Sequence, residues 1–461
     1  MSKKTKKGAQ KYVPKIMRGM RDILPEEMPY WDFVLRRACD LAETFGFKRI
    51  ETPILEEKQL FVKSTGQTTD VVEKQMYEFT DLGGNRVVMR PEITPQIVRA
   101  YIEQGMFNLP QPIKLFYFGP LFRYERPQSG RLREFHQFGL EVLGSIHPIV
   151  DAQIVLFSYT LFKNIGLNVI TQINSLGCPI CRRTYRTKLV SYFRSKRKHL
   201  CPDCKRRLEK NPLRILDCKE TSCHELATQS PQIVDNLCDE CKNHFVKVLE
   251  YLDEANIPYE LNPYLVRGLD YYTKTVFEFW PSAASAPQNE VKIDVQPTGE
   301  GITKAAAEIK PTEQEKTLAI ALGGGGRYDN LVESLGGRSA PAIGFAYGLE
   351  RIIDELKAQK VKILQKRAPQ IFLAKLGEAA TRRALKLFDD LQKEGFRVAE
   401  NLSKDSLRTQ LEIANRLGVK LSLIIGQQEV LDKTIIIRDM SSGNQEIVDQ
   451  EKLTKELRKR L

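Results

Sequence analysis

Eight of the nine cysteines in this 461-residue chain fall into four closely spaced pairs. The pairs are Cys178 with Cys181, Cys201 with Cys204, Cys218 with Cys223, and Cys238 with Cys241. A gap of two residues lets both thiolates of a pair turn toward one tetrahedral ion, and the nineteen residues between the first two pairs suit a zinc knuckle. We therefore expect structural Zn²⁺, because four thiolates leave no open position for catalysis.

Other interpretations of these cysteines stay open. Reduced cysteines with a purely structural role would give the same pattern, and His199, His224 and His244 lie beside the pairs as further candidate ligands. The ninth cysteine, Cys39, stands alone and is expected to be a small buried hydrophobic residue.

Arginines stand out in three segments of the first 360 residues. The first segment, residues 119–141, has an apolar run, a charged turn with Pro and Gly, and a second apolar run, which predicts a β-hairpin. It carries Arg123, and alternation places Gln137 and Glu141 on one face of the returning strand. A Gln or Glu side chain without a hydrogen-bond partner would destabilise a buried core, so we expect this face of the strand to line a pocket. His136 points the opposite way and is expected to be structural.

The second and third segments combine arginine with tyrosine and glycine. Residues 265–272 carry Arg267, and the third segment runs from the glycines at 323–326 through Arg327 to Arg351. Glycine lets backbone approach a phosphate closely while a guanidinium grips it, which predicts a phosphate-binding site. Flexible turns give similar glycine runs. A Walker-type loop is excluded, because no Gly-Lys-Ser/Thr follows.

Length and charge limit the class of protein. At roughly 150 residues per domain the chain should form about three units. No apolar run approaches the roughly 20 residues of a membrane span, and seven basic residues among the first twenty argue against a secretory signal, so we expect a cytoplasmic protein. The net charge of +13 favours a polyanionic partner, and residues 182–214 hold thirteen Lys and Arg against two acids.

Apolar periodicity divides the chain into regions. We expect a basic tail at 1–14, a large unit at 15–360 that contains a cysteine-rich basic insertion at 178–245 and an exposed loop at 281–316, and a C-terminal unit at 369–461. The large unit should hold helices at 31–45, 94–104, 149–163 and 352–358 and strands at 49–54, 87–89, 114–118, 275–280 and 317–322. In the C-terminal unit strands alternate with helices, which predicts a small α/β layer domain.

These segments resemble a known family. Residues 122–127 (FRYERP) and 344–351 (GFAYGLER) are similar to motifs two and three of the class II aminoacyl-tRNA synthetases, and residues 51–53 (ETP) to motif one. Residues 18–22 (RGMRD), 265–272 (LVRGLDYY) and 325–329 (GGRYD) narrow the resemblance to the histidyl-tRNA synthetases. The resemblance implies an α/β fold with an antiparallel-sheet catalytic core at 15–360 and an anticodon-binding domain at 369–461.

The resemblance also implies an activity and the residues that serve it. L-Histidine and ATP, accompanied by Mg²⁺, form histidyl-adenylate, and the acyl group then passes to the 3′-terminal ribose of tRNA(His). Arg123 is expected on the α-phosphate, Arg351 on the distal end of ATP, and Arg267 on the carboxylate and α-phosphate. The residues expected around histidine are Glu92, Thr94 and Gln137 at its α-amino group and Glu141, Tyr271 and Tyr272 at its ring.

A homodimer is implied as well, because class II cores use motif one at a two-fold interface, here with Pro53 near the contact. Zinc is not part of the resemblance, since several members have other residues in the insertion. We expect the insertion to lie over the tRNA acceptor arm and its metal to be dispensable for adenylation. Two rivals stay open: the synthetase-like regulatory subunit of ATP phosphoribosyltransferase, which lacks an anticodon domain, and a synthetase for threonine or proline, against which residues 267–272 argue.

Overall fold

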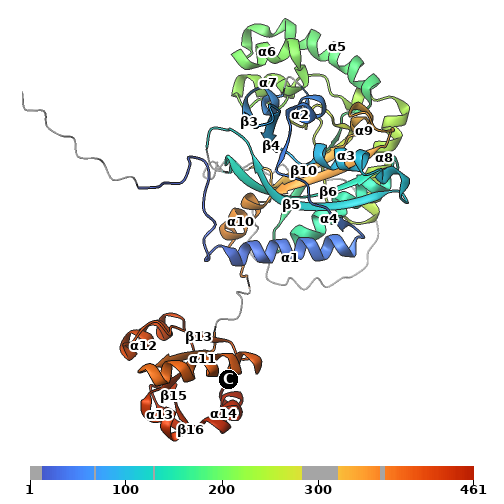
Figure 1. The fold of residues 1–461 in the computed structure, drawn as a ribbon. Coiled ribbons are helices and arrows are strands. Elements are labelled where there is room, and N and C mark those ends of the chain that lie inside the picture. Colours follow the sequence, from blue (N-terminus) through green and yellow to red (C-terminus); the bar gives the residue numbers. More distant parts are fainter. Residues whose placement is uncertain (1–12, 67–68, 128–129, 283–319, 364–368) are drawn as a thin grey trace, which may run out of the picture. The chain divides into compact units, whose positions relative to one another are not determined.

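The computed structural model describes residues 13–66, 69–127, 130–282, 320–363 and 369–461 (Figure 1). The chain forms two compact units, Met1–Val361 and Lys362–Leu461. Most of the tail expected at 1–14 and of the loop expected at 281–316 lies outside the described residues. Among the helices that are described, none is long and apolar enough to cross a membrane.

An eight-stranded sheet forms the centre of the first unit. Its strand order is β1-β5-β6-β11-β10-β9-β7-β8, and every pairing from β5 to β7 is antiparallel. The strands are β1 (Lys48–Arg49), β5 (Ile113–Phe122), β6 (Glu134–Leu143), β7 (Val169–Ser175), β8 (Glu260–Leu261), β9 (Thr273–Pro281), β10 (Gly323–Arg327) and β11 (Ala342–Gly348). The antiparallel core expected from the sequence is confirmed.

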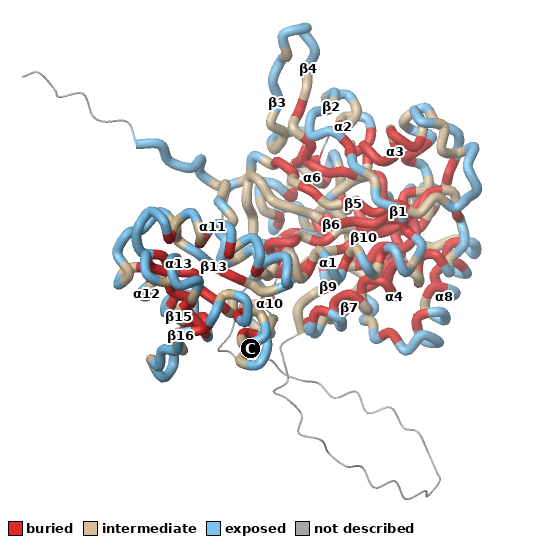
Figure 2. The backbone as a smooth tube through the Cα atoms, turned by 60° about the horizontal axis from the view of Figure 1, so that its bottom comes forward, coloured by how far each residue is buried: buried red, intermediate tan, exposed pale blue. Residues whose placement is uncertain are grey.

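Helices cover one face of this sheet. α1 (Met28–Thr44), α4 (Pro148–Asn164), α8 (Asp239–Glu254) and α10 (Leu349–Ala358) pack against aromatic residues such as Phe116, Phe138 and Phe345. Alternation in β6 brings Phe138 and Leu140 to this face, so Gln137 and Glu141 turn to the other. Buried residues accordingly concentrate along β5, β6 and β10 (Figure 2).

The opposite face carries smaller elements and the insertion. A second sheet has the order β2 (Leu55–Glu57), β4 (Arg86–Met89), β3 (Tyr77–Thr80), and α2 (Lys58–Thr65), the π-helical segment η1 (Val71–Gln75) and α3 (Thr94–Glu103) belong to the same region. The insertion forms α5 (Pro179–Ser195), α6 (Pro202–Lys210), η4 (Pro212–Ile215) and α7 (Thr221–Thr228) before α8 returns to the core. Figure 1 shows α5, α6 and α7 on the side of the sheet away from α1 and α10.

The second unit is a five-stranded mixed sheet with helices. Its order is β13-β12-β14-β15-β16, parallel on both sides of β12 and antiparallel beyond β14. The strands are β12 (Ile371–Lys375), β13 (Val398–Glu400), β14 (Leu421–Ile425), β15 (Thr434–Asp439) and β16 (Gln445–Asp449), and the helices α11 (Glu378–Lys393), α12 (Leu407–Arg416), α13 (Gln427–Asp432) and α14 (Leu453–Arg460). The sequence did not indicate β16, because four of its five residues are exposed and leave no alternation.

One strand predicted in the first unit is wrong, and a second is not formed in the part of it that the structure describes. Of residues 49–54 only Arg49 lies in a strand, because Pro53 has no N–H to donate to a ladder. Residues 320–322 of the strand expected at 317–322 lie outside any strand, and residues 317–319 are not described. The glycine run beyond them is strand β10. A Cβ at Gly325 would lie 2.1 Å from the carbonyl oxygen of Gly344, so this strand needs glycine to admit its neighbour.

Candidate active site

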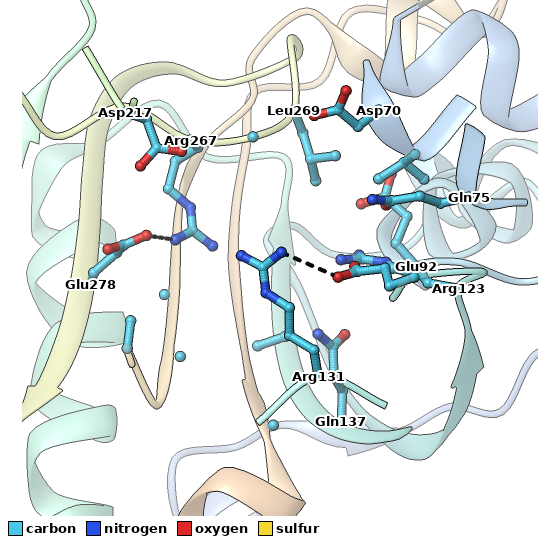
Figure 3. Close-up of a pocket in the computed structure, with 18 of the residues that line it drawn as sticks. Asp70, Gln75, Glu92, Arg123, Arg131, Gln137, Asp217, Arg267, Leu269 and Glu278 are labelled. Atoms are coloured by element: carbon cyan, nitrogen blue, oxygen red, sulfur yellow. Dashed lines mark hydrogen bonds and ion pairs between the residues drawn. The ribbon is translucent and has the colours of Figure 1, made fainter. Parts of the chain in front are cut away.

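A pocket of about 1140 Å³ lies over β5, β6, β10 and β11. Its walls come from η1, the loop before β9 and the insertion (Figure 3). Most of the site residues expected from the sequence line it; they are Glu92, Thr94, Arg123, Gln137, Arg267, Tyr271, Tyr272 and Arg351. The tertiary structure thus brings side chains from five separate segments to one cavity.

Three arginines reach the pocket from three different elements. Arg123 follows β5, and its Nε donates to the carbonyl oxygen of Pro91 at 2.9 Å. Arg351 lies in the first turn of α10, and its Nη1 donates to the carbonyl oxygen of Ala321 at 2.8 Å. Arg267, in the loop before β9, pairs with the carboxylate of Glu278. Each guanidinium is therefore held in one orientation before any ligand binds.

These arginines concentrate positive charge in one part of a pocket that acidic residues also line. Burial lowers the pKa of Arg351, and the nearby charges of Arg123, Arg131 and Arg267 lower it further. Burial also opposes the charge on Arg267, but Glu278, Tyr272 and Tyr271 together outweigh burial and hold the pKa of Arg267 above its ordinary value. Crowded guanidinium groups repel one another until a multiply charged anion joins them, so the pocket suits a polyphosphate.

A buried carboxylate marks the end of the pocket near α3. Glu92 Oε1 accepts a hydrogen bond from Thr65 Oγ1 at 2.9 Å, and its Oε2 accepts one from the Tyr271 hydroxyl at 3.1 Å. Burial raises the pKa of Glu92, while the charge of Arg123 opposes the rise. A carboxylate oriented by two hydroxyl donors is a suitable acceptor for a ligand ammonium group.

Glu141 lies beneath the pocket floor. It is 1% exposed, and its carboxylate accepts hydrogen bonds from Thr94 Oγ1 at 2.6 Å and from the Tyr328 hydroxyl at 2.5 Å. A Cβ at the pocket-lining Gly344 would fall 1.6 Å from Glu141 Oε2. The carboxylate therefore occupies space that any side chain at 344 would need. Burial raises the pKa of Glu141 to about 7.

Neighbours on β6 point to opposite sides of the sheet. Gln137 lines the pocket. His136 does not; its Nδ1 lies 2.9 Å from Glu350 Oε1 and its ring packs edge-on against Trp31 at 5.0 Å. The expectation that His136 is structural agrees with these contacts.

The glycine segment at 323–351 was expected to bind phosphate, but its Arg327 does not line the pocket. Its side chain is fully buried, where it bonds the carboxylate of Asp151 and donates to the carbonyl oxygen of Ser145 at 2.8 Å. His244 Nε2 lies 2.7 Å from the same carboxylate, so His244 is not a spare metal ligand. Burial raises the pKa of Asp151, but Arg327 and His244 outweigh it and hold that pKa below its ordinary value. The network fastens α4 and α8 to β10.

Sequence reasoning missed several residues of the pocket. Tyr117 could have been found, because it pairs with Gly139 across the hairpin and so shares the face of Gln137 and Glu141. Tyr328 was noticed only as part of the glycine segment. Other missed residues come from distant segments that no local pattern connects; they are Asp70, Gln75, Arg207, Arg214, Asp217 and Glu278.

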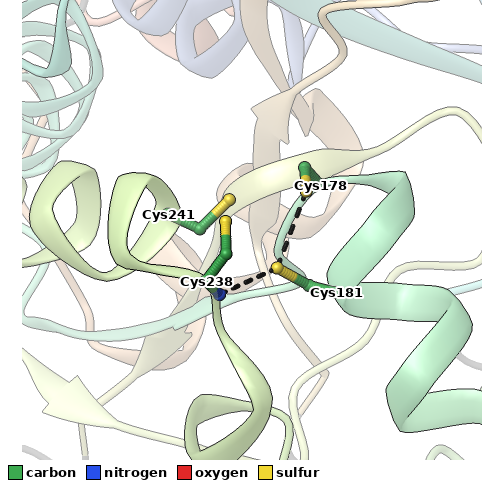
Figure 4. A group of neighbouring side chains, drawn as sticks. All are labelled: Cys178, Cys181, Cys238 and Cys241. Atoms are coloured by element: carbon green, nitrogen blue, oxygen red, sulfur yellow. Dashed lines mark hydrogen bonds between the residues drawn. The ribbon is translucent and has the colours of Figure 1, made fainter.

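The eight paired cysteines gather in two groups of four. We call Cys178, Cys181, Cys238 and Cys241 the neck cluster (Figure 4) and Cys201, Cys204, Cys218 and Cys223 the inner cluster. Within each group all sulfur atoms lie within 4.8 Å of one another, with 3.6 Å between Cys178 and Cys181 and 3.9 Å between Cys201 and Cys218. Four Zn–S bonds of about 2.3 Å in a tetrahedron would separate the sulfurs by about 3.8 Å, so both groups have a fitting size.

The pairing expected from spacing is wrong, because the first and second pairs do not share a site. Cys178 and Cys238 are the N-cap residues of α5 and α8, and the Cys238 N–H donates to Cys181 Sγ at 3.1 Å. The two ends of the insertion meet at the sheet, so the first pair joins the last and the middle pairs join each other. Neither His199 nor His224 belongs to either group.

The chain is similar to proteins of one known family along most of its length. The model of histidyl-tRNA synthetase matches residues 19–174, and the model of the anticodon binding domain matches residues 370–460. The histidine–tRNA ligase of Caldicellulosiruptor saccharolyticus is 42% identical over 447 residues, which cover 96% of this chain and 99% of that protein. The histidine–tRNA ligase of Pelotomaculum thermopropionicum is 40% identical over 445 residues, which cover 96% of this chain and 97% of that protein.

A solved structure gives the same result. Apo histidyl-tRNA synthetase from S. aureus matches with a TM-score of 0.74 and 32% identity, over 96% of this chain and 99% of that one. The alternative of a regulatory subunit is excluded, because the similarity extends through the C-terminal unit that such a subunit was expected to lack. The alternative of a synthetase for threonine or proline is excluded, because the relatives are named for histidine. The chain therefore belongs to the histidyl-tRNA synthetase family of class II aminoacyl-tRNA synthetases.

Proposed function

We propose that this chain ligates L-histidine to tRNA(His) in two steps at the pocket over β5, β6, β10 and β11. First, a carboxylate oxygen of histidine attacks the α-phosphorus of ATP, and the bond to the bridging oxygen of pyrophosphate breaks. Second, a hydroxyl of the 3′-terminal ribose attacks the acyl carbon of the adenylate, and AMP leaves. Neither step needs a covalent bond to the protein, so the pocket acts by positioning and by neutralising charge.

The three arginines supply that charge in this proposal. Arg123 binds the α-phosphate, Arg351 the distal phosphates, and Arg267 both the histidine carboxylate and the α-phosphate. ATP enters with Mg²⁺ on its phosphates, as membership of the family implies. The proposal is supported by the backbone hydrogen bonds that fix Arg123 and Arg351 and by the ion pair that fixes Arg267, because donors already in place cost no reorganisation during reaction.

Histidine is recognised at both of its ends. Glu92 accepts from the α-ammonium group, with Thr94 and Gln137 beside it, and Glu141 accepts from a ring N–H at the floor below Gly344. Tyr271 and Tyr272, whose ring centroids are 4.6 Å apart, stand beside the imidazole. An amino acid without a ring N–H would leave the buried Glu141 carboxylate without that donor, which penalises the wrong substrate.

The tRNA is held by the basic insertion and the C-terminal unit in this proposal. Residues 370–460 match an anticodon-binding model, and the exposed residues Arg183, Arg186, Lys188 and Arg194 lie along α5. Lysine and arginine on one helix gain affinity for a phosphate backbone by releasing its counterions. The insertion is therefore placed on the acceptor arm, while the 369–461 unit binds the anticodon.

Zn²⁺ occupies both cysteine clusters in this proposal and stabilises the insertion. Each cluster offers four thiolates and no other ligand, which suits a closed tetrahedral site. A segment with so many like charges needs such cross-links to keep one shape. All nine cysteines are free thiols, in keeping with the reducing cytoplasm proposed for this chain.

The working form is a homodimer in which motif one lies at the two-fold axis. Ile54 and Leu55, next to Pro53, are 42% and 49% exposed. Two adjacent apolar side chains exposed on one chain are covered readily by a second copy.

The observation that carries the proposed function is the pocket itself, which is lined by three fixed guanidinium groups and the buried carboxylate of Glu92, with the Glu141 carboxylate beneath its floor. ATP–pyrophosphate exchange measured with each of the twenty amino acids tests it. Histidine alone should support rapid exchange, and only tRNA(His) should then be charged. Exchange supported equally by another amino acid would contradict the assignment of Glu141.

A further inference from the structure

The inner cluster lies in the wall of the active-site pocket. Cys201 and Cys218 line the pocket, whereas no cysteine of the neck cluster does. Between Cys204 and Cys218 the chain forms the end of α6 and then η4. We call residues 205–217 the latch segment. A metal ion held by the inner cluster would fix both ends of this segment.

The latch segment contacts η1 through charged side chains. Arg214 Nη2 donates to Asp70 Oδ2 at 2.8 Å, and Arg207 Nη2 lies 3.7 Å from the same oxygen. Lys210 Nζ donates to Glu73 Oε1 at 3.2 Å. The Arg214 side chain is only 14% exposed, so its ion pair with Asp70 is less screened by solvent than a pair on the open surface.

The latch segment also contacts the loop before β9. Asn211 Nδ2 donates to Asp270 Oδ1 at 2.7 Å. On its other side Asp270 lies so close to Gly66 that a Cβ there would be 2.5 Å from Asp270 Oδ2. Asp270 is therefore enclosed between the latch segment and the chain that leads into η1.

Both contacted loops lead directly to residues that we assign to the substrates. Tyr271, which follows Asp270, donates its hydroxyl to Glu92, and Thr65, which precedes Gly66, donates to the same carboxylate. At the far end of η1 the carbonyl oxygen of Gln75 accepts from the N–H of Tyr124 at 2.7 Å, one residue beyond Arg123. A displacement of the latch segment would therefore move the residues that we assign to histidine binding.

We propose that the latch segment holds η1 and the loop before β9 in their histidine-binding positions, and that metal in the inner cluster sets the position of the latch segment. The first half rests on the proposed histidine site and the second on the proposed zinc sites. Arg214 and Asp70 are positioning residues, because they act through η1. The expectation that the insertion's metal is dispensable for adenylation is thereby reversed for the inner cluster and kept for the neck cluster.

The ion pair is tested by Asp70→Asn and Arg214→Ala in ATP–pyrophosphate exchange. Each change should raise the KM for histidine about five- to tenfold, a usual size for coupling between sites, and change the KM for ATP much less. Arg214→Lys should retain part of the affinity for histidine. The variant with both Asp70→Asn and Arg214→Ala should lose less histidine affinity than the two single variants lose together, because both changes remove the same interaction. Hydrogen exchange at residues 69–75 should quicken in the same variants.

Arg197→Ala is the matched control. Its ion pair with Glu209, at 3.2 Å, also reaches the latch segment, but both side chains are more than half exposed and neither lines the pocket, so this pair contributes little to the position of the segment. It should leave the KM for histidine unchanged. The proposed role of the latch segment would be contradicted if Asp70→Asn and Arg214→Ala both kept the wild-type KM for histidine. It would also be contradicted if Arg197→Ala raised that KM equally.

The metal is tested by comparing Cys201→Ser/Cys204→Ser with Cys178→Ser/Cys181→Ser. Elemental analysis should show each double variant losing one of two zinc ions per chain, and calorimetry should show weaker histidine binding mainly in the first. Equal weakening in both would overturn the coupling. Absence of zinc from the wild-type protein would instead refute the proposed metal sites, while the Asp70 and Arg214 variants would still decide the latch.

Discussion

The guanidinium of Arg267 pairs with the carboxylate of Glu278 on strand β9, and no side chain at Gly324 separates them. A Cβ at Gly324 would lie 2.8 Å from Arg267 Nη1 and 2.9 Å from Glu278 Cγ. The glycine strand β10 and the carboxylate together fix the direction in which Arg267 enters the pocket. The role of Arg267 in catalysis should therefore depend on its charge and on this partner.

Arg267→Ala should lower the rate of adenylate formation about one-hundredfold or more, the usual cost of removing a preorganised charge stabiliser. ATP binding should weaken far less, because the charge matters most as the α-phosphorus becomes pentavalent. Rapid-quench measurement of the adenylate in a single turnover separates the two effects. Glu278→Gln should give a smaller loss, since Arg267 remains but is held less firmly. A rate within about tenfold of wild type in Arg267→Ala would remove this arginine from the proposed role.

Glu141→Gln should raise the KM for histidine and leave the KM for ATP nearly unchanged. The pKa of Glu141, raised to about 7 by burial, also predicts a pH effect. Near pH 7 the free carboxyl is protonated in roughly half of the molecules, and a ring N–H of histidine favours the ionised form, so binding should release roughly half a proton. As the pH falls below 7, histidine binding should weaken. Calorimetry in buffers of different ionisation enthalpy measures the release, and the Gln variant should show none from this site.

Gly344→Ala should damage histidine binding without touching a residue that binds phosphate. The added methyl group would overlap Glu141 Oε2 at 1.6 Å, so the carboxylate must move away from the floor. Overpacking of this kind usually costs about 1–3 kcal/mol of stability. We expect a lower melting temperature and a histidine KM raised at least about tenfold in the folded fraction, a difference of about 1.4 kcal/mol. An unchanged KM would show that Glu141 does not approach the ring.

The homodimer is tested by light scattering at micromolar concentration. The dimer should give twice the chain mass of 52.8 kDa. Ile54→Asp with Leu55→Asp should shift the protein toward a monomer, because two charges would be buried in the interface. A wild-type mass near that of one chain would contradict the proposal.

Basic residues on α5 should contribute to tRNA affinity and to its salt dependence. Arg183→Ala with Arg194→Ala should weaken binding and reduce the slope of log affinity against log salt by roughly one for each phosphate that is no longer neutralised. The exposed Arg36 on α1 provides a control on the other face of the sheet. Exchange without tRNA should stay normal in all these variants. An unchanged salt slope in the double variant would remove α5 from the tRNA interface.

The sequence predicted the elements whose residues interact with near neighbours. Helix α3 at Thr94–Glu103 and the hairpin of β5 and β6 follow from periodicities of 3.6 and 2, which are local properties of the chain. The same alternation placed Gln137 and Glu141 together and turned His136 away. Charge and cysteine spacing marked the insertion, and the motifs around Arg123, Arg267 and Arg351 indicated the family.

Other features depended on contacts between residues far apart in the sequence. Only the tertiary structure showed that the glycine run is strand β10, that Arg327 is buried against Asp151 and that the first cysteine pair meets the last. It also brought the latch segment against Asp70. Spacing along a chain limits only nearby partners, whereas these partners were selected by sheet order and by the meeting of the two ends of the insertion, which exist only once the chain has folded.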